Sequence, residues 1–437
     1  MRNAAHSPAH ALLALFATLA LLQVAHAAPL AERIVVDDEN PAWLMRANGN
    51  PVFICGPGDP EGFLYRGTEN ADGTRNGDQS SLIQTLAGTG ANSIYLIALR
   101  SHGGDGDATQ NPFVDHNPSL GLNQAVLDQW EEWFDQMDEA GIVIYFFFYD
   151  DSALVWSSGN NVTQAERNFV HGLVNRFEHH SNLIWAIAEE YSEAYSSARV
   201  SALADEVRIA DDNDHPIAVH QLSGLSFDFP NDPSIGQFAI QHNVATAEAL
   251  HDGVVSAWDD AGGRYNLMLA EAEGWGTGGE SRRKAWACAL GGAYVMIYEM
   301  DIATTPLSDL VDCGRLVSFM ERTDFRELAP RDDLASAGTE YVLASPGQSY
   351  IAYSSTNATS MGVKGLVAGT YHLHWFDCAT GSSVDQTVTA GNGTVNWPVP
   401  GALGNEVALW ARSATASTSA ESSVAPRTWS TVKSLYR

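Results

Sequence analysis

The sequence has 437 residues, of which 45% are hydrophobic and 17% charged, so it is long enough for one large globular domain and a small one. Its formal net charge is −30 and its pI is about 4.6. A surface this negative repels nucleic acids and anionic lipids, so neither class of partner is expected.

The N-terminal residues have the pattern of a targeting segment. Arg2 precedes the apolar stretch "ALLALFATLALLQ", and the small-residue sequence "AHA" ends at Ala27. This pattern is typical of a signal peptide, and the apolar stretch is short for a membrane span. We therefore expect residues 1–27 to be removed and the protein to be secreted or periplasmic, without insertion into a membrane.

Short apolar runs alternate with amphipathic segments along most of the chain. A β-hairpin with its turn at "NGN" is predicted first, and Thr163 with Glu166 forms a capping box at one helix start. The predicted helices are Leu122–Ala140, Thr163–His179, Ser192–Asp211, Ala245–Ala261, Ser281–Leu290 and Leu307–Thr323. The predicted strands are Val52–Cys55, Ser93–Ala98, Ile142–Phe148, Leu183–Ala188, Ile217–His220, Gln237–Ile240, Asn266–Ala270 and Tyr294–Tyr298.

Eight strands, most of them followed by a helix, indicate an α/β fold of the (β/α)8, or TIM, barrel type over residues 28–330. Several of these runs are apolar throughout, as a parallel sheet covered on both faces requires. A doubly wound open sheet is the structural alternative, but no Gly-rich phosphate loop follows the first strand.

The pattern changes after the barrel. From Glu340 onward, short alternating strands are separated by Gly and Ser turns, which predicts a small antiparallel β-sandwich over residues 331–412. The Ser/Thr-rich residues 413–437 are expected to be a disordered tail. The four cysteines, Cys55, Cys288, Cys313 and Cys378, have no metal-binding spacing, so free buried thiols or one disulfide are expected.

Two strands of the predicted barrel run directly into pairs of glutamates. Glu189 and Glu190 follow the fourth strand, and Glu271 and Glu273 follow the seventh. Residues at the C-terminal ends of barrel strands face the mouth of the barrel, where catalytic groups lie. Two carboxylates that face each other, one protonated and one ionised, are the machinery of glycoside hydrolysis.

The fourth strand carries a family resemblance. The run from Ile184-Trp185 to Glu189-Glu190 resembles the I-W-x-x-x-N-E pattern of clan A (β/α)8 glycoside hydrolases. The resemblance implies that Glu190 is the acid/base. Glu189 stands where the family has an Asn that contacts the sugar 2-hydroxyl, and this departure leaves open which of the two glutamates is the acid.

The resemblance extends to the seventh strand and to the mechanism. It implies that Glu271 is the nucleophile, with Glu273 as the alternative. A retaining, double-displacement mechanism would follow, with the two carboxyl groups roughly 5–5.5 Å apart.

More narrowly, the chain is similar to the apiosidase-like branch, whose small C-terminal sandwich is often labelled collagen-binding. The shared stretches are "NPAWLMRANGNPVFICG", "RRKAWACALGGAYVMIY", "FMERTDFRELAP" and "YIAYSS" with "GTYHLHWFDCATG", which together span most of residues 40–412. Such sandwiches can simply brace the barrel.

Further substrate-binding candidates lie where the predicted strands end. Arg100 is a candidate for holding the nucleophile ionised, and His242, with His220 as the alternative, for hydrogen bonding to the nucleophile or the sugar. Tyr191 and Trp275 are candidates for stacking on sugar rings. The remaining candidates are acids at the barrel mouth: Asp59, Glu61, Asp150, Asp151 and Glu299.

These observations predict an exported glycosidase that acts on a polysaccharide or oligosaccharide without a metal or cofactor. A non-catalytic carbohydrate-binding protein on a degenerate barrel is the main alternative, because Glu189 replaces the expected Asn. An adhesion protein that engages a matrix through the sandwich, and a polysaccharide lyase, are further alternatives.

Overall fold

The computed structural model describes residues 31–58, 62–272, 274–297 and 301–416. The predicted leader and residues 417–437 of the predicted tail lie outside these ranges. Four of the predicted site residues, Asp59, Glu61, Glu273 and Glu299, also lie outside the described residues. No helix in the described ranges is long and apolar enough to cross a membrane.

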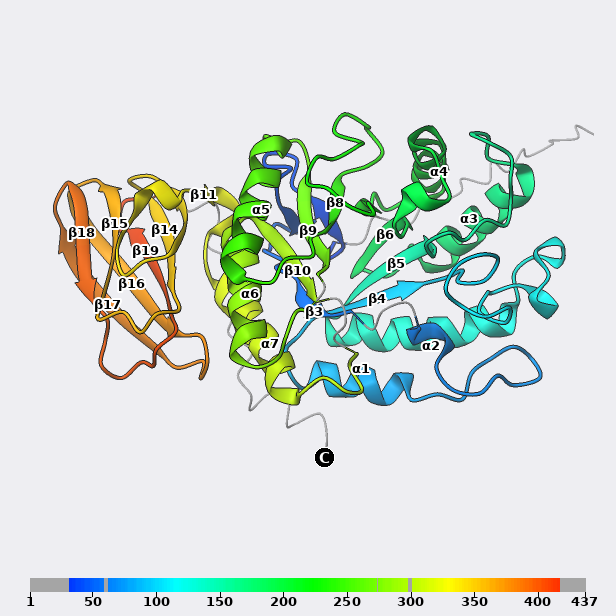
Figure 1. The fold of residues 1–437 in the computed structure, drawn as a ribbon, viewed down its shortest axis with the longest axis horizontal. Coiled ribbons are helices and arrows are strands. Elements are labelled where there is room, and N and C mark those ends of the chain that lie inside the picture. The colour runs from blue at the N-terminus through cyan, green and yellow to red at the C-terminus, as the bar shows by residue number, and fades with distance from the viewer. Residues whose placement is uncertain (1–30, 59–61, 273, 298–300, 417–437) are drawn as a thin grey trace, which may run out of the picture.

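Eight parallel strands form the central sheet, in the spatial order β3-β10-β9-β8-β7-β6-β5-β4, which confirms the predicted barrel (Figure 1). The strands are β3 (Cys55–Pro57), β4 (Ser93–Ile97), β5 (Val143–Tyr149), β6 (Leu183–Ala188), β7 (Ile217–His220), β8 (Gln237–Gln241), β9 (Asn266–Glu271) and β10 (Ala293–Ile297). The helices around them are α1 (Gln79–Ala87), α2 (Gln124–Ala140), α3 (Gln164–Phe177), α4 (Ser197–Ala210), α5 (Ala247–Ala261), α6 (Gly279–Leu290) and α7 (Leu307–Arg322).

Asn92, just before β4, links β4 to β3 and so closes the barrel. The Asn92 side chain donates to Phe53 O and accepts from Cys55 N, and its backbone N–H donates to Cys55 O. The first strand was predicted at Val52–Cys55 but begins only at Cys55. The reason is local: the Phe53 N–H donates to the Glu321 side chain of α7 rather than to a neighbouring strand.

The helix ends follow capping chemistry. Thr163 caps α3 by accepting from Glu166 N, as the capping box predicted. Asn123 caps α2 by accepting from Ala125 N, and Gly141 ends that helix with a left-handed φ of 72°. The helix predicted from Ser192 begins only at Ser197, because a short 3-10 turn (Tyr191–Glu193) comes first.

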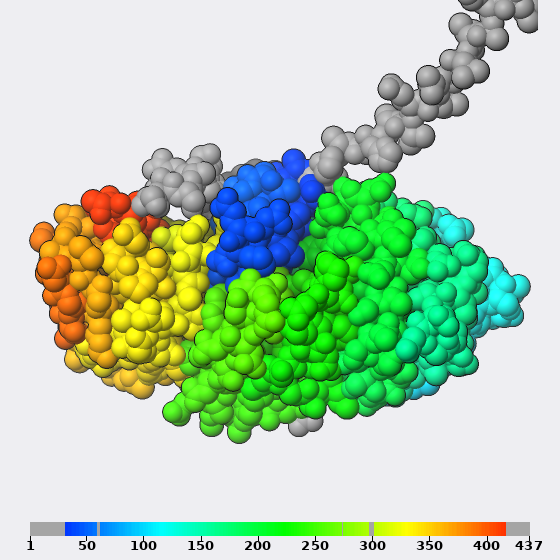
Figure 2. Space-filling view, turned by 90° about the horizontal axis from the view of Figure 1, so that it is seen from above, coloured from blue at the N-terminus to red at the C-terminus, as the bar shows by residue number. Residues whose placement is uncertain are grey.

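A β-hairpin covers the N-terminal end of the barrel. It pairs β1 (Ile34–Val36) with β2 (Leu44–Arg46), and the predicted "NGN" turn follows β2. Ile34 N donates to Ser181 O just before β6, and Leu44 N donates to the Tyr294 hydroxyl at the start of β10. Figure 2 shows this segment, in blue, lying beside both the yellow and the green segments. The C-terminal ends of the strands lie at the opposite end of the barrel.

Two antiparallel sheets form the C-terminal sandwich, as predicted. The six-stranded sheet has the order β11 (Ala329–Pro330), β13 (Tyr341–Ser345), β14 (Ser349–Ser354), β19 (Val407–Ser413), β16 (Gly369–Asp377) and β17 (Ser383–Ala390). The three-stranded sheet has the order β12 (Ala335–Ala337), β15 (Ser360–Leu366) and β18 (Gly393–Pro398). Trp375, Tyr350 and Met361 are among the buried side chains between them.

The sandwich packs against the helices on one side of the barrel, next to α5, α6 and α7 in Figure 1. Trp286 of α6 stacks on Tyr353 of β14 with ring centroids 5.4 Å apart. Arg282 of α6 reaches Glu406 at 2.8 Å. All four cysteines are buried and free, so the alternative of one disulfide is not formed.

Candidate active site

Three buried polar side chains meet at the C-terminal end of the barrel. Glu189 directly follows β6, His220 ends β7 and Glu271 ends β9. One donor or acceptor atom from each lies within 4.8 Å of the others. The strand ends therefore bring together an imidazole and two carboxylates, and the two carboxylates lie 82 positions apart in the sequence (271 − 189).

Tyr95 holds Glu189 in place. Its hydroxyl donates to Glu189 Oε1 at 2.7 Å, and its ring stacks on Phe147 with centroids 4.3 Å apart. The Glu189 N–H in turn donates to Tyr149 O of the neighbouring strand. The carboxylate thus projects from a rigid, packed base.

His220 links the fourth-strand and seventh-strand ends as a neutral imidazole. Burial lowers the pKa of His220 to about 3. Its Nδ1 accepts the Glu190 N–H at 3.4 Å, which places the ring proton on Nε2. That nitrogen lies 3.7 Å from Glu271 Oε2 and, among the described residues, has no hydrogen-bond partner. It is a buried donor that points at the carboxylates.

Glu190 adopts a left-handed backbone conformation, with φ 36° and ψ 45°. For a non-glycine residue this costs on the order of 1–3 kcal/mol, and such strain gathers at functional sites. Gln241 fixes the side chain by donating from Nε2 to Glu190 Oε1 at 2.8 Å. Gln241 ends β8, directly after an irregularity in the β8–β9 pairing. The half-buried Glu190 carboxylate thus has a defined position.

Glu190 also belongs to a second acidic group, with Asp151 and Glu193. One carboxylate oxygen from each lies within 4.8 Å of the others. Burial, together with the charges of Asp150, Asp105, Glu193 and Glu190, raises the pKa of Asp151 to about 7. Asp151 is therefore partly protonated at neutral pH, beside a candidate catalytic acid.

Arg100 and Asp150 form a buried pair that shapes the loop after β4. Arg100 Nε donates to Asp150 Oδ2 at 3.1 Å, and its Nη1 donates to Gln110 Oε1 at 2.9 Å. Asp150 also accepts the Asp105 N–H. These contacts make Arg100 part of the loop framework after β4, and its contact with the nucleophile stays a prediction.

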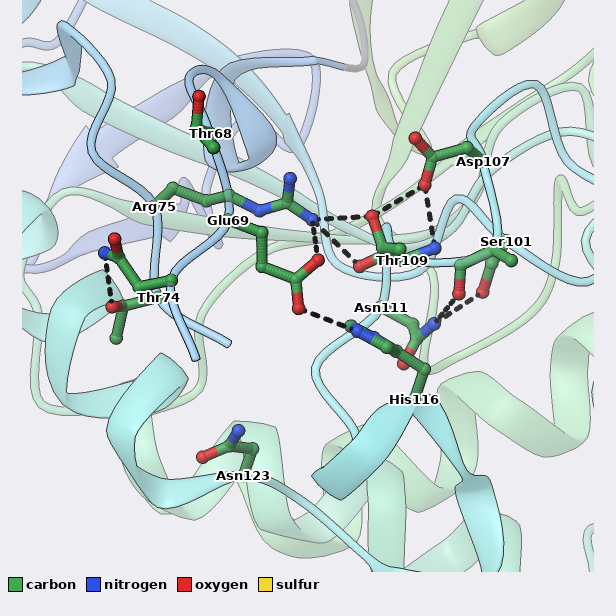
Figure 3. A network of polar contacts seen from close by, with 12 residues as sticks. Thr68, Glu69, Thr74, Arg75, Ser101, Asp107, Thr109, Asn111, His116 and Asn123 are labelled. Atoms are coloured by element: carbon green, nitrogen blue, oxygen red, sulfur yellow. Dashed lines mark hydrogen bonds and ion pairs between the residues drawn. The ribbon is translucent and has the colours of Figure 1, made fainter. Parts of the chain in front are cut away.

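The loops after β3 and β4 are tied to each other at the rim (Figure 3). Arg75 donates to Thr109 Oγ1 at 2.8 Å and pairs with Glu69, which also binds His116 at 2.8 Å. Asp107 accepts from the backbone and the hydroxyl of Thr109. The rim next to Arg100 is thus an ordered network.

Three rings that are predicted to contact the sugar have protein partners, and their contact with a sugar stays a prediction. His242 lies against α5, since a Cβ at Gly253 would come within 2.3 Å of His242 Nε2. The Tyr191 hydroxyl donates to Asp228, and burial followed by this bond raises the pKa of Tyr191 to about 12. Trp275 is buried and donates from Nε1 to Ser281 Oγ at 2.8 Å. Of the two candidate histidines, His220 is the one beside the carboxylates.

Sequence reasoning missed Tyr95, Gln241 and Glu193. Gln241 had a usable signal, because it is a polar residue that ends an apolar strand, as Glu271 is. Tyr95 had none, because a Tyr inside a buried strand has the pattern of core packing.

Neither a protein-family profile nor a curated protein matches this sequence. Among solved structures, a glycoside hydrolase matches with a TM-score of 0.68 and 15% identity, over 89% of this chain and 98% of that one. A glycoside hydrolase family 5 structure from Bacteroides vulgatus matches with a TM-score of 0.67 and 14% identity, over 87% and 94%. A second structure from the same organism, also named as a glycoside hydrolase, matches with a TM-score of 0.64 and 13% identity, over 88% of this chain and 82% of that one. The chain therefore shares the fold of these glycoside hydrolases over nearly its whole described length.

Proposed function

We propose that the protein is a secreted glycosidase that cleaves O-glycosidic bonds of a polysaccharide or oligosaccharide. The observation that carries this proposal is the meeting of Glu189 and Glu271, with Glu190 beside them, at the C-terminal end of a barrel. The fold likeness to glycoside hydrolases supports it.

In the proposed mechanism Glu271 attacks the anomeric carbon while Glu190 protonates the leaving oxygen. A covalent glycosyl-enzyme forms, and Glu190 then takes a proton from the water that hydrolyses it. Retaining enzymes place their two catalytic carboxyl groups about 5–5.5 Å apart, and the proposed route requires this spacing between Glu190 and Glu271. His220 Nε2–H is placed to donate to Glu271 or to the sugar.

Glu190 is the better candidate for the acid than Glu189. It is only half-buried, so it can reach the leaving group, and Gln241 orients it. The carboxylates of Asp151 and Glu193 beside it oppose further negative charge at this place. Glu189 is buried and bound by Tyr95, which suits contact with a sugar hydroxyl.

The test is a set of three single variants, Glu190→Gln, Glu271→Gln and Glu189→Gln, assayed on polysaccharides and on aryl glycosides. We expect Glu190→Gln and Glu271→Gln each to lower kcat on polysaccharide by about 10²–10⁴-fold, because each removes a proton-transfer or nucleophilic group. Aryl glycosides with a good leaving group form the glycosyl-enzyme without help from a general acid. Glu190→Gln should therefore retain the rate of this first step on aryl glycosides.

Azide assigns the roles further. It should rescue Glu190→Gln with retained anomeric configuration and Glu271→Gln with inverted configuration. If Glu189→Gln shows the acid-variant pattern instead, the acid assignment passes to Glu189. Full activity in all three variants would contradict the mechanism.

A carbohydrate-binding protein without activity is the second candidate. It is favoured by the third carboxylate, Glu189, crowded within 4.8 Å of Glu271 where the family pattern has an amide. Binding of an oligosaccharide without release of reducing ends, unchanged in Glu271→Gln, would support this candidate.

A further inference from the structure

A cluster of four side chains that could bind a metal lies at the end of the barrel opposite the candidate active site. Glu131 and Asp135 lie one turn apart on α2, and His179 and His180 follow α3 just before β6 begins. One ligand-type atom from each of the four lies within 4.8 Å of all the others. Two segments separated in the sequence thus aim two carboxylates and two imidazoles at one point.

The distances inside this cluster are near those of a metal site. His179 Nε2 lies 2.7 Å and His180 Nε2 lies 3.3 Å from the same oxygen, Glu131 Oε1. Ligand atoms bound tetrahedrally to Zn²⁺ at about 2.0–2.1 Å are about 3.3–3.4 Å apart. Small side-chain adjustments therefore suffice to seat an ion between them.

The buried side chain of His180 is the feature of this cluster that indicates a ligand. Its side chain is 1% exposed, and its Nε2 has no hydrogen-bond partner among the described residues. A neutral imidazole is the form that binds metal, and a buried nitrogen without a partner is otherwise unfavourable.

Neighbouring groups hold the cluster in place. Arg176 donates to Glu131 Oε2 at 2.7 Å and pairs with Asp128, which leaves Oε1 facing the two imidazoles. The carboxylates of Asp135 and Asp138 also act on His180 and add negative charge near the cluster. Supporting contacts of this kind orient metal ligands.

We propose that Glu131, Asp135, His179 and His180 bind a divalent transition-metal ion of the Zn²⁺ class. Two imidazoles and two carboxylates suit such ions better than Ca²⁺ or Mg²⁺, which prefer oxygen ligands alone. The ion ties the C-terminal half of α2 to the chain that enters β6. The site does not depend on the proposed glycosidase activity.

The test is calorimetric titration of the metal-stripped full protein with ZnCl₂. We expect the wild type to bind one Zn²⁺ ion. His179→Ala and Asp135→Ala should each bind it at least about tenfold more weakly. Both side chains are exposed, so the variants should fold normally. His372→Ala and Glu139→Ala, exposed changes outside the cluster, are the matched controls and should bind as the wild type does.

Two further measurements complete the test. Zn²⁺ should raise the thermal midpoint of the wild type but not of His179→Ala, because only the folded state holds the site. Co²⁺ should give visible absorption bands typical of tetrahedral coordination. Absence of Zn²⁺ binding, or equal binding by His179→Ala and Asp135→Ala, would overturn the proposal. So would a site lost in Glu271→Gln but kept in His179→Ala, which would place the ion at the other cluster.

Discussion

At the scale of single residues, the candidate catalytic side chains lie at the ends of buried strands, whereas the apolar side chains within those strands pack in the core. Glu189, His220 and Glu271 are buried polar groups that directly follow or end apolar strands. Tyr95 sets the orientation of Glu189, and the Glu190 N–H donates to Nδ1 of His220. The two perturbed groups at this site, Asp151 and His220, lead to opposite pH effects on stability.

Asp151→Asn should stabilise the protein more at pH 8 than at pH 4. The pKa of Asp151 is raised to about 7 in the folded state, above its ordinary value near 3.8. The folded state therefore binds the proton more tightly, and its stability falls as pH rises from about 4 to 7. The Asn side chain does not titrate, so the variant does not lose stability in this way as the pH rises. Urea midpoints of the variant and the wild type across this pH range measure it, and a constant difference between them would contradict the expectation.

His220→Asn should flatten the acid side of the stability profile. The pKa of His220 falls to about 3 on folding, from about 6.5, so the unfolded state gains a proton first as pH falls. At pH 4 this disfavours the folded wild type by about 3 kcal/mol. Asn can still accept from Glu190 N but does not titrate. The free energy of unfolding at pH 7.5 and pH 4 tests this, and a variant with the wild-type pH slope would disprove it.

At the scale of elements, α6 and α7 bury large aromatic side chains against the sandwich. Trp286 of α6 and Phe319 of α7 contact Tyr353 and Phe376. Predicted helix bounds agree with the structure within about two residues, except at the start of α4. There the left-handed Glu190 and the 3-10 turn after it displace the helix, which amphipathic spacing does not reveal.

Trp286→Ala should lower the free energy of unfolding by about 3–5 kcal/mol, because it leaves a cavity between α6 and the sandwich. Catalysis per folded molecule should be unchanged, since this contact is remote from the strand ends. Chemical denaturation gives the change, with the exposed Val367→Ala as the control, expected to shift stability by no more than about 0.5 kcal/mol. A Trp286→Ala effect as small as that of the control would show that the interface contributes little.

At the scale of the whole molecule, the barrel is closed at one end and braced on one side. The hairpin covers the N-terminal strand ends through Trp43, whose ring packs edge-on against Tyr294 at the start of β10, with ring centroids 5.7 Å apart. The sandwich covers α6 and α7, and one continuous core includes side chains from both domains, among them Leu343 and Ala408. The candidate active site lies at the C-terminal strand ends, which the hairpin does not cover.

Truncation after residue 330 should therefore destabilise the barrel rather than leave it intact. It would expose Trp286 and Phe319 and remove the Glu406 partner of Arg282. We expect a lower thermal midpoint and a tendency to aggregate, measured by calorimetry and light scattering. A truncated barrel with the full-length midpoint would mean that the sandwich serves binding rather than bracing.

The barrel, the sandwich and the strand-end glutamates could be predicted from the sequence, because hydrophobic periodicity and its interruption are local properties. The tertiary structure was needed to show that His220 rather than His242 faces Glu271, and that Tyr95 and Gln241 contact the acids. It also brought Glu131 and Asp135 to His179 and His180. Side-chain direction and contacts between distant segments depend on how strands and helices pack against each other, which no local pattern records.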